Sequence, residues 1–143
     1  MKTFAPKKDS YSEAWYIVDA EGKTLGRIAS KVAAVLRGKN LTTFAPYADP
    51  RNFVVVINAN KIKLTGKKWR DKKYIHHTGW PGHLREISAT DLMKKKPTKM
   101  IEEAIYGMLP HNRLGSALRR HLKIYVGKEH PHTAQQPQPL KLN

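Results

Sequence analysis

Three histidines that lie close together are the first candidates for chemistry in this sequence. They are His76, His77 and His83. Imidazole nitrogen binds zinc, and a metal-bound water can hydrolyse RNA. The neighbouring side chains are mostly Lys and Arg, which repel a cation, and no cluster of carboxylates accompanies them. We therefore expect these histidines to hydrogen bond to phosphate or ribose, with no catalytic residue and no bound metal. A metal-assisted nuclease that uses the three histidines is the alternative.

A second short pattern, Gly22-Lys23-Thr24, matches the end of a phosphate-binding P-loop. The complete pattern needs another glycine five residues earlier, where this chain has Ile17. Without that glycine the loop lacks the cradle of backbone amides that holds a nucleotide. A nucleotidase is therefore not favoured.

The most informative property of the composition is its charge. Lys and Arg number 27 against 11 Asp and Glu in 143 residues, which gives a formal net charge of +16. A compact domain with this imbalance repels itself until a polyanion neutralises it. Nucleic acid is the favoured polyanion, because each phosphate contact releases a counterion. The alternatives are a merely solvated surface and the surface of an anionic membrane.

The basic residues gather in three clusters, at residues 61–73, 94–99 and 113–123. Aromatic residues interleave with the first cluster, and exposed rings stack on unpaired bases. For Trp69 and Trp80, packing beneath a loop is an equally good interpretation. For the arginines of the third cluster, the alternative is a solvated helix face. The candidate RNA-contacting residues are Lys61, Lys63, Lys67, Lys68, Trp69, Arg70, Lys72, Lys73, His76, His77, Lys94, Lys95, Lys96, Arg113, Arg119, Arg120 and Lys123.

Hydrophobic periodicity predicts the elements that position these clusters. Residues 15–18 are aromatic and β-branched, as in a strand, and residues 25–36 carry apolar side chains on one helical face. Thr24 is the expected N-cap, and Gly38 is the expected left-handed residue after the helix. Residues 53–57 are continuously apolar, as in a strand buried on both faces. Strand, helix and buried strand together predict a right-handed βαβ unit.

The rest of the chain is predicted to alternate between irregular segments and short elements. Residues 61–65 alternate in polarity and predict a half-exposed strand, whereas residues 66–87 contain Gly and Pro and predict a loop. Pro97 and Pro110 are expected to end helices. The remaining expected elements are a helix from Thr90 to the Lys94–Pro97 run, a helix over residues 100–109, a short helix through Leu114, Leu118 and Leu122, and a last strand at 124–126.

The length fits one domain with extended ends. We expect an N-terminal arm at residues 1–13, a single α/β domain at 14–126, and an extended C-terminal tail at 127–143. The absence of cysteine excludes disulfides and fits a reducing compartment. The first residues lack the apolar segment of a secretory signal, and no apolar run approaches the roughly 18 residues of a membrane span. We therefore expect a soluble cytoplasmic protein.

The segment Ile105-Tyr106-Gly107-Met108-Leu109-Pro110-His111-Asn112-Arg113-Leu114-Gly115 resembles a known signature. It is similar to the Gly-Met-Leu-Pro…Leu-Gly motif of the bacterial large-subunit ribosomal protein L13 family. The resemblance extends in order over about residues 13–140, and the first dozen residues match least. Further matching blocks are residues 15–20, 22–27, 58–59, 65–67, 76–79, 122–125 and 130–137.

This resemblance implies a small three-layer α/β/α core with a mostly parallel sheet, basic loops and extended termini. It implies a structural constituent of the large ribosomal subunit that binds large-subunit rRNA, supports early assembly and is not an enzyme. The implied partners are this rRNA and neighbouring large-subunit ribosomal proteins, with no membrane and no small-molecule substrate. No cofactor is expected, and Mg²⁺ only as part of the rRNA environment. A free-standing regulator of messenger RNA is an alternative that differs only in its ligand.

The resemblance also indicates which segments lie near RNA. They are residues 65–67, 76–79, 107–110, 115 and 135–137, which adds Thr78, Gln135 and Gln136 to the candidate RNA-contacting residues. Within the signature, Gly107 is expected to allow close packing, and Pro110 to end the helix.

Overall fold

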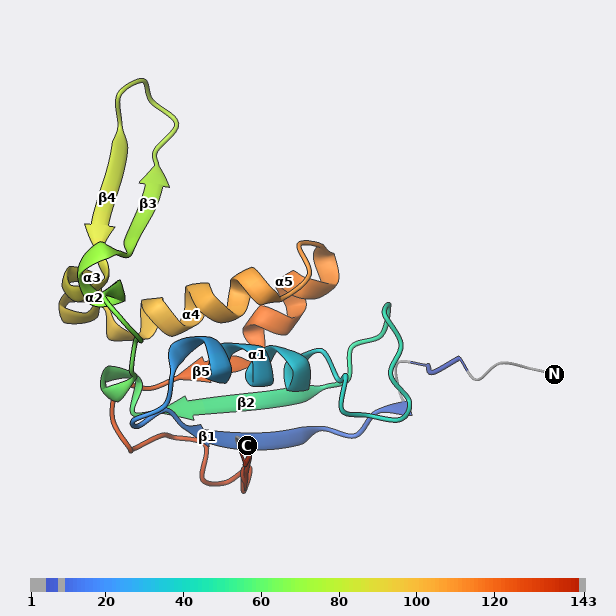
Figure 1. The fold of residues 1–143 in the computed structure, drawn as a ribbon. Helices are drawn as coiled ribbons and strands as arrows, with labels where there is room; N and C mark the ends of the chain where they lie inside the picture. Colours follow the sequence, from blue (N-terminus) through green and yellow to red (C-terminus); the bar gives the residue numbers. More distant parts are fainter. Residues whose placement is uncertain (1–4, 8–9, 142–143) are drawn as a thin grey trace.

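The computed structural model describes residues 5–7 and 10–141. Figure 1 shows a body of sheet and helices from which a hairpin projects at one end. In the described residues, the body holds a four-stranded sheet and the projection is two-stranded. The strands are β1 (Ala14–Asp19), β2 (Asn52–Ile57), β5 (Leu122–Ile124) and β6 (Gln138–Pro139) in the body, and β3 (Lys73–His77) and β4 (Leu84–Ser88) in the hairpin.

The predicted strand–helix–strand unit is present as β1, α1 (Leu25–Leu36) and β2. The two strands pair in parallel along their whole length, and the expected apolar face of α1 is buried. Gly38 adopts φ +77° after the helix, where a side chain would collide with Pro50. The buried Asn52 donates from Nδ2 to the carbonyl oxygen of Val35 at 2.7 Å. This bond fixes the start of β2 against the end of α1.

The sheet has the order β5-β2-β1-β6, and all three pairings are parallel. This arrangement confirms the predicted α/β class with a mostly parallel sheet. Because side chains alternate along a strand, Val18, Val54 and Leu122 share one face. They form the main hydrophobic core together with α1 and α4 (Pro97–Met108).

The other face of the sheet carries stacked rings. The rings of Trp15 and Phe53 lie parallel, with centroids 4.5 Å apart. His121 packs on Phe53 at 4.4 Å, and His132, from the C-terminal segment, packs on Trp15 at 5.1 Å. In Figure 1, α1, α4 and α5 lie on the core side of the sheet, and the C-terminal segment lies on the other side. In the described residues, part of the second outer layer of the expected three-layer arrangement is therefore built by this segment and not by a helix.

The helices of the second half agree with their predictions. α3 (Ala89–Lys95) and α5 (Arg113–Arg120) begin at Ser88 and Asn112, whose side-chain oxygens accept hydrogen bonds from backbone amides of the first turn. α4 begins at Pro97, where a proline is tolerated because it lacks the amide that a helix start leaves unpaired. Leu109 then leaves the helical conformation directly before Pro110.

The prediction of a loop over residues 66–87 is wrong. The segment contains α2 (Lys68–Asp71) and the antiparallel pair β3 and β4. Only Gly79, Pro81 and Gly82 and their neighbours form the connection. The hairpin is exposed except for the half-buried Tyr74, Ile87 and Ser88, so its strands lack the hydrophobic alternation that marks a strand with one buried face.

The predicted strand at residues 61–65 is also wrong. The chain forms a single 3₁₀ turn, η2 (Ala59–Lys61), and Lys63 then makes one isolated bridge to Thr24. The alternation of Ile62 and Leu64 is present, since Ile62 is buried and Leu64 half-buried. These side chains pack against the core from an irregular segment.

The last part of the chain differs in position from the prediction. β5 begins two residues earlier than expected, because α5 ends at Arg120 and Leu122 enters the sheet opposite Val54. The tail is extended but adds the edge strand β6, and the Leu140 amide donates to Ile17 at 2.9 Å. Residues 1–4 and 8–9 of the predicted arm and 142–143 of the tail lie outside the described residues. In the described part, no helix is long and apolar enough to cross a membrane.

Candidate nucleic-acid interface

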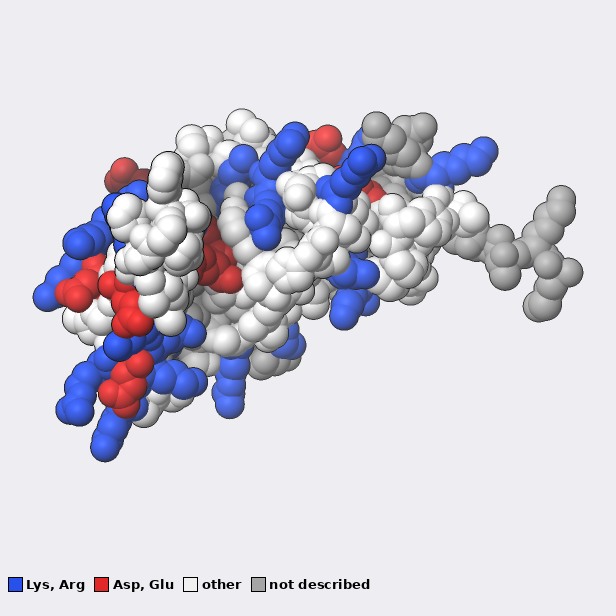
Figure 2. All heavy atoms as spheres, turned by 90° about the horizontal axis from the view of Figure 1, so that it is seen from above, with Lys and Arg blue, Asp and Glu red and all other residues white. Residues whose placement is uncertain are grey.

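Basic side chains cover several parts of the body rather than one strip. Figure 2 shows Lys and Arg at both ends and along the middle of one face, with Asp and Glu mostly at the hairpin end. All of the predicted Lys and Arg contacts are exposed except Lys123, which is half-buried in β5. Such a surface offers contacts to more than one segment of a polyanion.

Two lysines of the first cluster are engaged by carboxylates. Lys61 lies 2.8 Å from Glu21, and Lys73 lies 2.8 Å from Glu86 across the hairpin. The hydrogen bonds that these lysines donate to the carboxylates, followed by the negative charges of Glu21 and Glu86, raise the pKa of both lysines. Both pairs are exposed, so they are weak and can exchange a carboxylate for a phosphate.

Other cations of this cluster remain without an acidic partner. Among the residues that the structure describes, Lys63, Lys67, Lys68 and Lys72 have no carboxylate within salt-bridge distance. Lys72 also lies over the ring of Tyr74, with Nζ 5.2 Å from its centroid. These lysines are therefore the part of the first cluster most available to phosphate, whereas Arg70 lies 3.6 Å from its neighbour Asp71.

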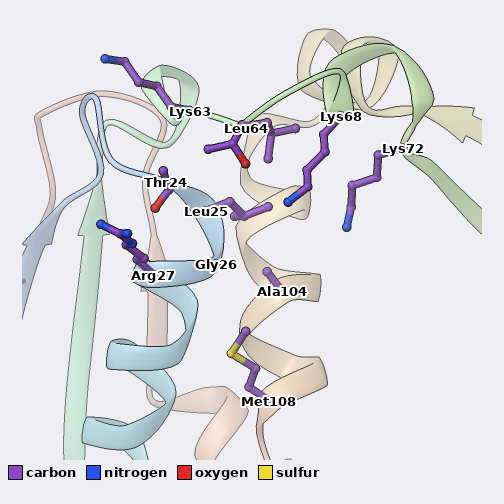
Figure 3. Close-up of a pocket in the computed structure, with 11 residues that line it drawn as sticks. Thr24, Leu25, Gly26, Arg27, Lys63, Leu64, Lys68, Lys72, Ala104 and Met108 are labelled. Carbon is purple, nitrogen blue, oxygen red and sulfur yellow. The ribbon is translucent and has the colours of Figure 1, made fainter.

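Lys68 and Lys72 border a cavity of about 630 Å³ between the start of α1 and the second half of α4, which we call the α1–α4 cavity. Figure 3 shows both ammonium groups directed into the space beside Ala104. Arg27, which also lines it, was not among the predicted contacts. Its position outside the apolar stripe of α1 was the available signal in the sequence.

The hairpin separates the three histidines of the first prediction. His76 and His77 are consecutive on β3, so their side chains point to opposite faces, and His83 lies in the connection. All three are exposed, as is Thr78. Nowhere in the described residues do three or more His, Cys, Asp or Glu side chains come close enough to hold a metal ion. The spacing in sequence therefore does not become a ligand set in space.

The two tryptophans of this region have different environments. Trp69, in α2, is half-buried and packs against the core, so the packing interpretation holds for it. Trp80, at the end of the hairpin, is 71% exposed, and Ile75 and Leu84 on the strands are exposed as well. Trp80 is thus the ring that can stack on a base.

The second cluster meets the hairpin across a further cavity of about 470 Å³. Lys95 and Lys96, at the end of α3, line it opposite His76. Arg85 and Lys99 line the same cavity. Arg85 was not predicted, because only its pairing with β3 brings it there. Lys99, in the first turn of α4, belongs to the second basic cluster but was not among the candidate contacts. The exposed Lys94 is outside it.

The basic residues of the third cluster lie on two elements, with the arginines on α5 and Lys123 on β5. Arg113, Arg119 and Arg120 are exposed on α5, and the guanidinium of Arg119 lies over the Tyr106 ring, 4.7 Å from its centroid. Lys123 pairs with Val55, between the core-facing Leu122 and Ile124, so it points to the opposite face of the sheet. The structure therefore does not place Lys123 with the arginines. The predicted Gln135 and Gln136 are exposed in a turn that precedes β6.

Comparison with known proteins decides the family. A model of the family described as Ribosomal protein L13 matches residues 13–131. The large ribosomal subunit protein uL13 of Alcanivorax borkumensis is 54% identical over 142 residues, which cover 99% of this chain and 100% of the relative. The uL13 protein of Syntrophomonas wolfei is 54% identical over 96% of both chains, and that of Symbiobacterium thermophilum is 51% identical over 99% of both. The chain belongs to the ribosomal protein L13 family.

The L13 signature of this chain forms the turn between α4 and α5. A side chain on Gly115 would overlap the carbonyl oxygen of Pro110, so only glycine fits there. Gly107 is different, because a Cβ at this position would meet nothing within 4 Å. The prediction that Gly107 allows close packing is therefore wrong. Gly107 is exposed on α4, and nothing in the described structure explains why this position is a glycine.

Proposed function

We propose that this protein is a structural constituent of the large ribosomal subunit that binds large-subunit rRNA. The observation that carries the proposal is membership of the L13 family over residues 13–131, together with relatives named large ribosomal subunit proteins that align over nearly the whole chain. The net charge of +16 supports it independently.

The proposed mechanism is electrostatic. Lysines around the α1–α4 cavity, lysines at the end of α3 and arginines of α5 lie on different parts of the body and are exposed. Each group neutralises phosphates of a different RNA segment. RNA segments that repel one another can then pack around one small protein. Sequence-specific reading of bases is minor, because the deep groove of A-form RNA excludes side chains.

Further parts of the proposal concern where the protein acts. It works in the cytoplasm, within the ribosome, beside other large-subunit proteins, and joins the subunit early in its assembly. It needs no cofactor of its own beyond the Mg²⁺ of the rRNA. Support comes from the names of the relatives and from the exposed basic surface.

The test measures binding of the purified protein to large-subunit rRNA over a range of salt concentrations. Sub-micromolar affinity with a steep negative log–log salt slope is expected. Affinity no greater than for a random RNA of equal length would contradict the assignment to large-subunit rRNA. Assembly of large subunits without this protein, with no change in rate or yield, would contradict the assembly role.

The alternative function is a metal-dependent nuclease. The exposed, divergent histidines of the hairpin argue against a shared metal. Incubation of the protein with rRNA and Zn²⁺ or Mg²⁺ discriminates between the two functions. Metal-dependent cleavage that His77→Ala abolishes would establish the nuclease instead.

A further inference from the structure

The α1–α4 cavity has the composition of a site for an amphipathic anion. Leu25, Leu64, Ala104 and Met108 form an apolar wall, and Met108 is 49% exposed. Lys68 and Lys72 direct their ammonium groups into the space beside this wall (Figure 3). None of the described residues that line the cavity is acidic. A ligand with one phosphate and an apolar or aromatic part matches this site, because the phosphate suits the two ammonium groups and the apolar part suits the wall.

The start of α1 adds to the positive potential at the same place. Thr24 occupies the N-cap position, but its side chain makes no capping hydrogen bond, and its buried Oγ1 has no partner in the described structure. The first turn of α1 contains no acidic residue. The Leu25 amide donates to the carbonyl oxygen of Lys63 at 3.1 Å, whereas the next amides, of Gly26 and Arg27, have no side-chain acceptor from the cap. An external anion can take that place.

Gly26 is unexplained by the fold of the chain itself. It occupies the first turn of α1 and lines the cavity, its φ is not in the left-handed region, and a Cβ there would meet nothing within 4 Å. Glycine inside a helix costs about 1 kcal/mol relative to alanine. Neither packing nor backbone conformation requires it here. Close approach of a ligand to the backbone would require it.

We propose that the α1–α4 cavity binds one nucleotide unit of the RNA backbone. The phosphate lies between Lys68 and Lys72 and faces the start of α1, over Gly26. The ribose and the edge of its base lie on Ala104 and Met108. The volume of about 630 Å³ is ample for one nucleotide. This site rests on the proposed function, because the ligand is a segment of large-subunit rRNA.

RNA rather than a free nucleotide is the expected occupant. The cavity lies within a basic surface that continues to the lysines of residues 61–73 and to Arg37 and Lys39, which line a smaller cavity that shares Met108. A polymer satisfies all these charges at once, whereas a mononucleotide satisfies only one group of them.

The first test combines two kinds of variant, whose folding is checked by circular dichroism. Gly26→Leu fills the open space over the first turn of α1, and the double variant Lys68→Gln with Lys72→Gln removes both ammonium groups. Each is expected to weaken rRNA binding about tenfold, and the double variant also lowers the salt slope by about one unit. The matched control is Lys31→Gln with Lys128→Gln, which removes the same charge from exposed positions outside the described cavities. The control is expected to change affinity much less.

Stability separates a ligand site from a structural role. Gly26→Ala is expected to raise the midpoint of urea unfolding, because alanine favours the helix, while it weakens rRNA binding. If Gly26 served only folding, Gly26→Ala would lower both the urea midpoint and the affinity for rRNA.

The outcomes distinguish this site from the general function. If the wild type does not bind large-subunit rRNA, the proposed function fails. If the wild type binds and the three cavity variants bind equally well, only the nucleotide site is overturned. A further experiment titrates the protein with AMP and with GTP. If a free nucleotide saturates the cavity and rRNA does not displace it, the inference that RNA is the occupant is overturned. Protection of a discrete rRNA position from hydroxyl radicals, lost in Gly26→Leu and kept in the control, supports the proposal.

Discussion

The carbonyl oxygen of Pro110 occupies the space that a side chain on Gly115 would need. The same glycine donates its amide to Oδ1 of Asn112 at 2.8 Å and so caps α5. The turn between α4 and α5 is therefore closed by a backbone contact that only glycine permits, and this contact sets the position of the α5 arginines.

Gly115→Ala is expected to destabilise the protein by about 2–3 kcal/mol, since the new methyl group forces the Pro110 carbonyl and the start of α5 apart. Urea unfolding measures the change. Gly107→Ala is the matched control: a Cβ meets nothing there, and alanine favours the helix by about 0.5–1 kcal/mol. Equal effects of the two substitutions would show that the Pro110 contact has no energetic importance.

Replacing Arg119 and Arg120 by alanine is expected to weaken rRNA binding and to flatten its salt dependence by roughly one unit of slope for each lost phosphate contact. Both side chains are exposed on α5, and Arg119 is held over Tyr106. Filter binding at several salt concentrations gives the slope. An unchanged slope would show that neither arginine contacts phosphate.

The exposed Trp80 and the half-buried Trp69 predict opposite results for the two alanine variants. Trp80→Ala should leave stability within about 0.5 kcal/mol of the wild type and reduce rRNA affinity. Trp69→Ala should lower stability, because the ring packs against the core. Urea unfolding and rRNA titration of both variants test this pair. Loss of stability in Trp80→Ala would mean that the hairpin end packs on the body.

The contact between Tyr125 and His132 predicts a pH dependence. Tyr125 Oη lies 2.8 Å from His132 Nε2. Burial, followed by the charges of His130 and Lys123, lowers the pKa of His132. The folded state therefore favours the neutral ring, so its contribution to stability is complete above pH 6.5 and is lost as the pH falls below that value.

Amide exchange of Leu140, which donates to Ile17, reports the attachment of the C-terminal segment. Its protection should decrease between pH 7.5 and 5 beyond the intrinsic change in exchange rate. In His132→Phe, which keeps an aromatic ring on Trp15, this extra dependence should disappear. If it persists, another group controls the attachment.

Asp19 gives a second pH dependence of opposite sign. Nδ2 of Asn58 donates to Oδ1 of Asp19 at 2.8 Å. This bond, the Glu21 amide and nearby lysines lower the pKa of Asp19. The corresponding stability is present above the ordinary value of 3.8 and is lost as the pH falls through the lowered pKa. Asn58→Gly keeps the left-handed backbone at φ +56° and should return the pKa of Asp19, followed by NMR, toward 3.8.

Periodicity predicted those elements that bury one face. The apolar stripe of α1 and the continuous run of β2 carry their own signal, because each has a core on at least one side. The hairpin carries no such signal, since its strands lie away from the core and only their mutual pairing defines them. The position of β5 was missed because Leu122 continues the spacing of Leu114 and Leu118 while belonging to a strand.

The candidate site shows a similar division. Charge counting identified Lys68 and Lys72, but the cavity that unites them with Gly26 and Met108 depends on the packing of α4 beside α1. No spacing in the sequence indicates that contact. Lys123 is the opposite case. It is close to Arg120 in sequence, but its side chain lies on the other face of the sheet.

The order of strands in the sheet has a consequence for synthesis. The two central strands, β1 and β2, are complete once residue 57 has been made, whereas both edge strands come from residues 122–139. A nascent chain can thus form the central βαβ unit early, with both sheet edges still unpaired. Those edges stay unpaired until residues 122–139 have also been made, so the nascent chain is open to unwanted strand pairing throughout the synthesis of residues 58–121.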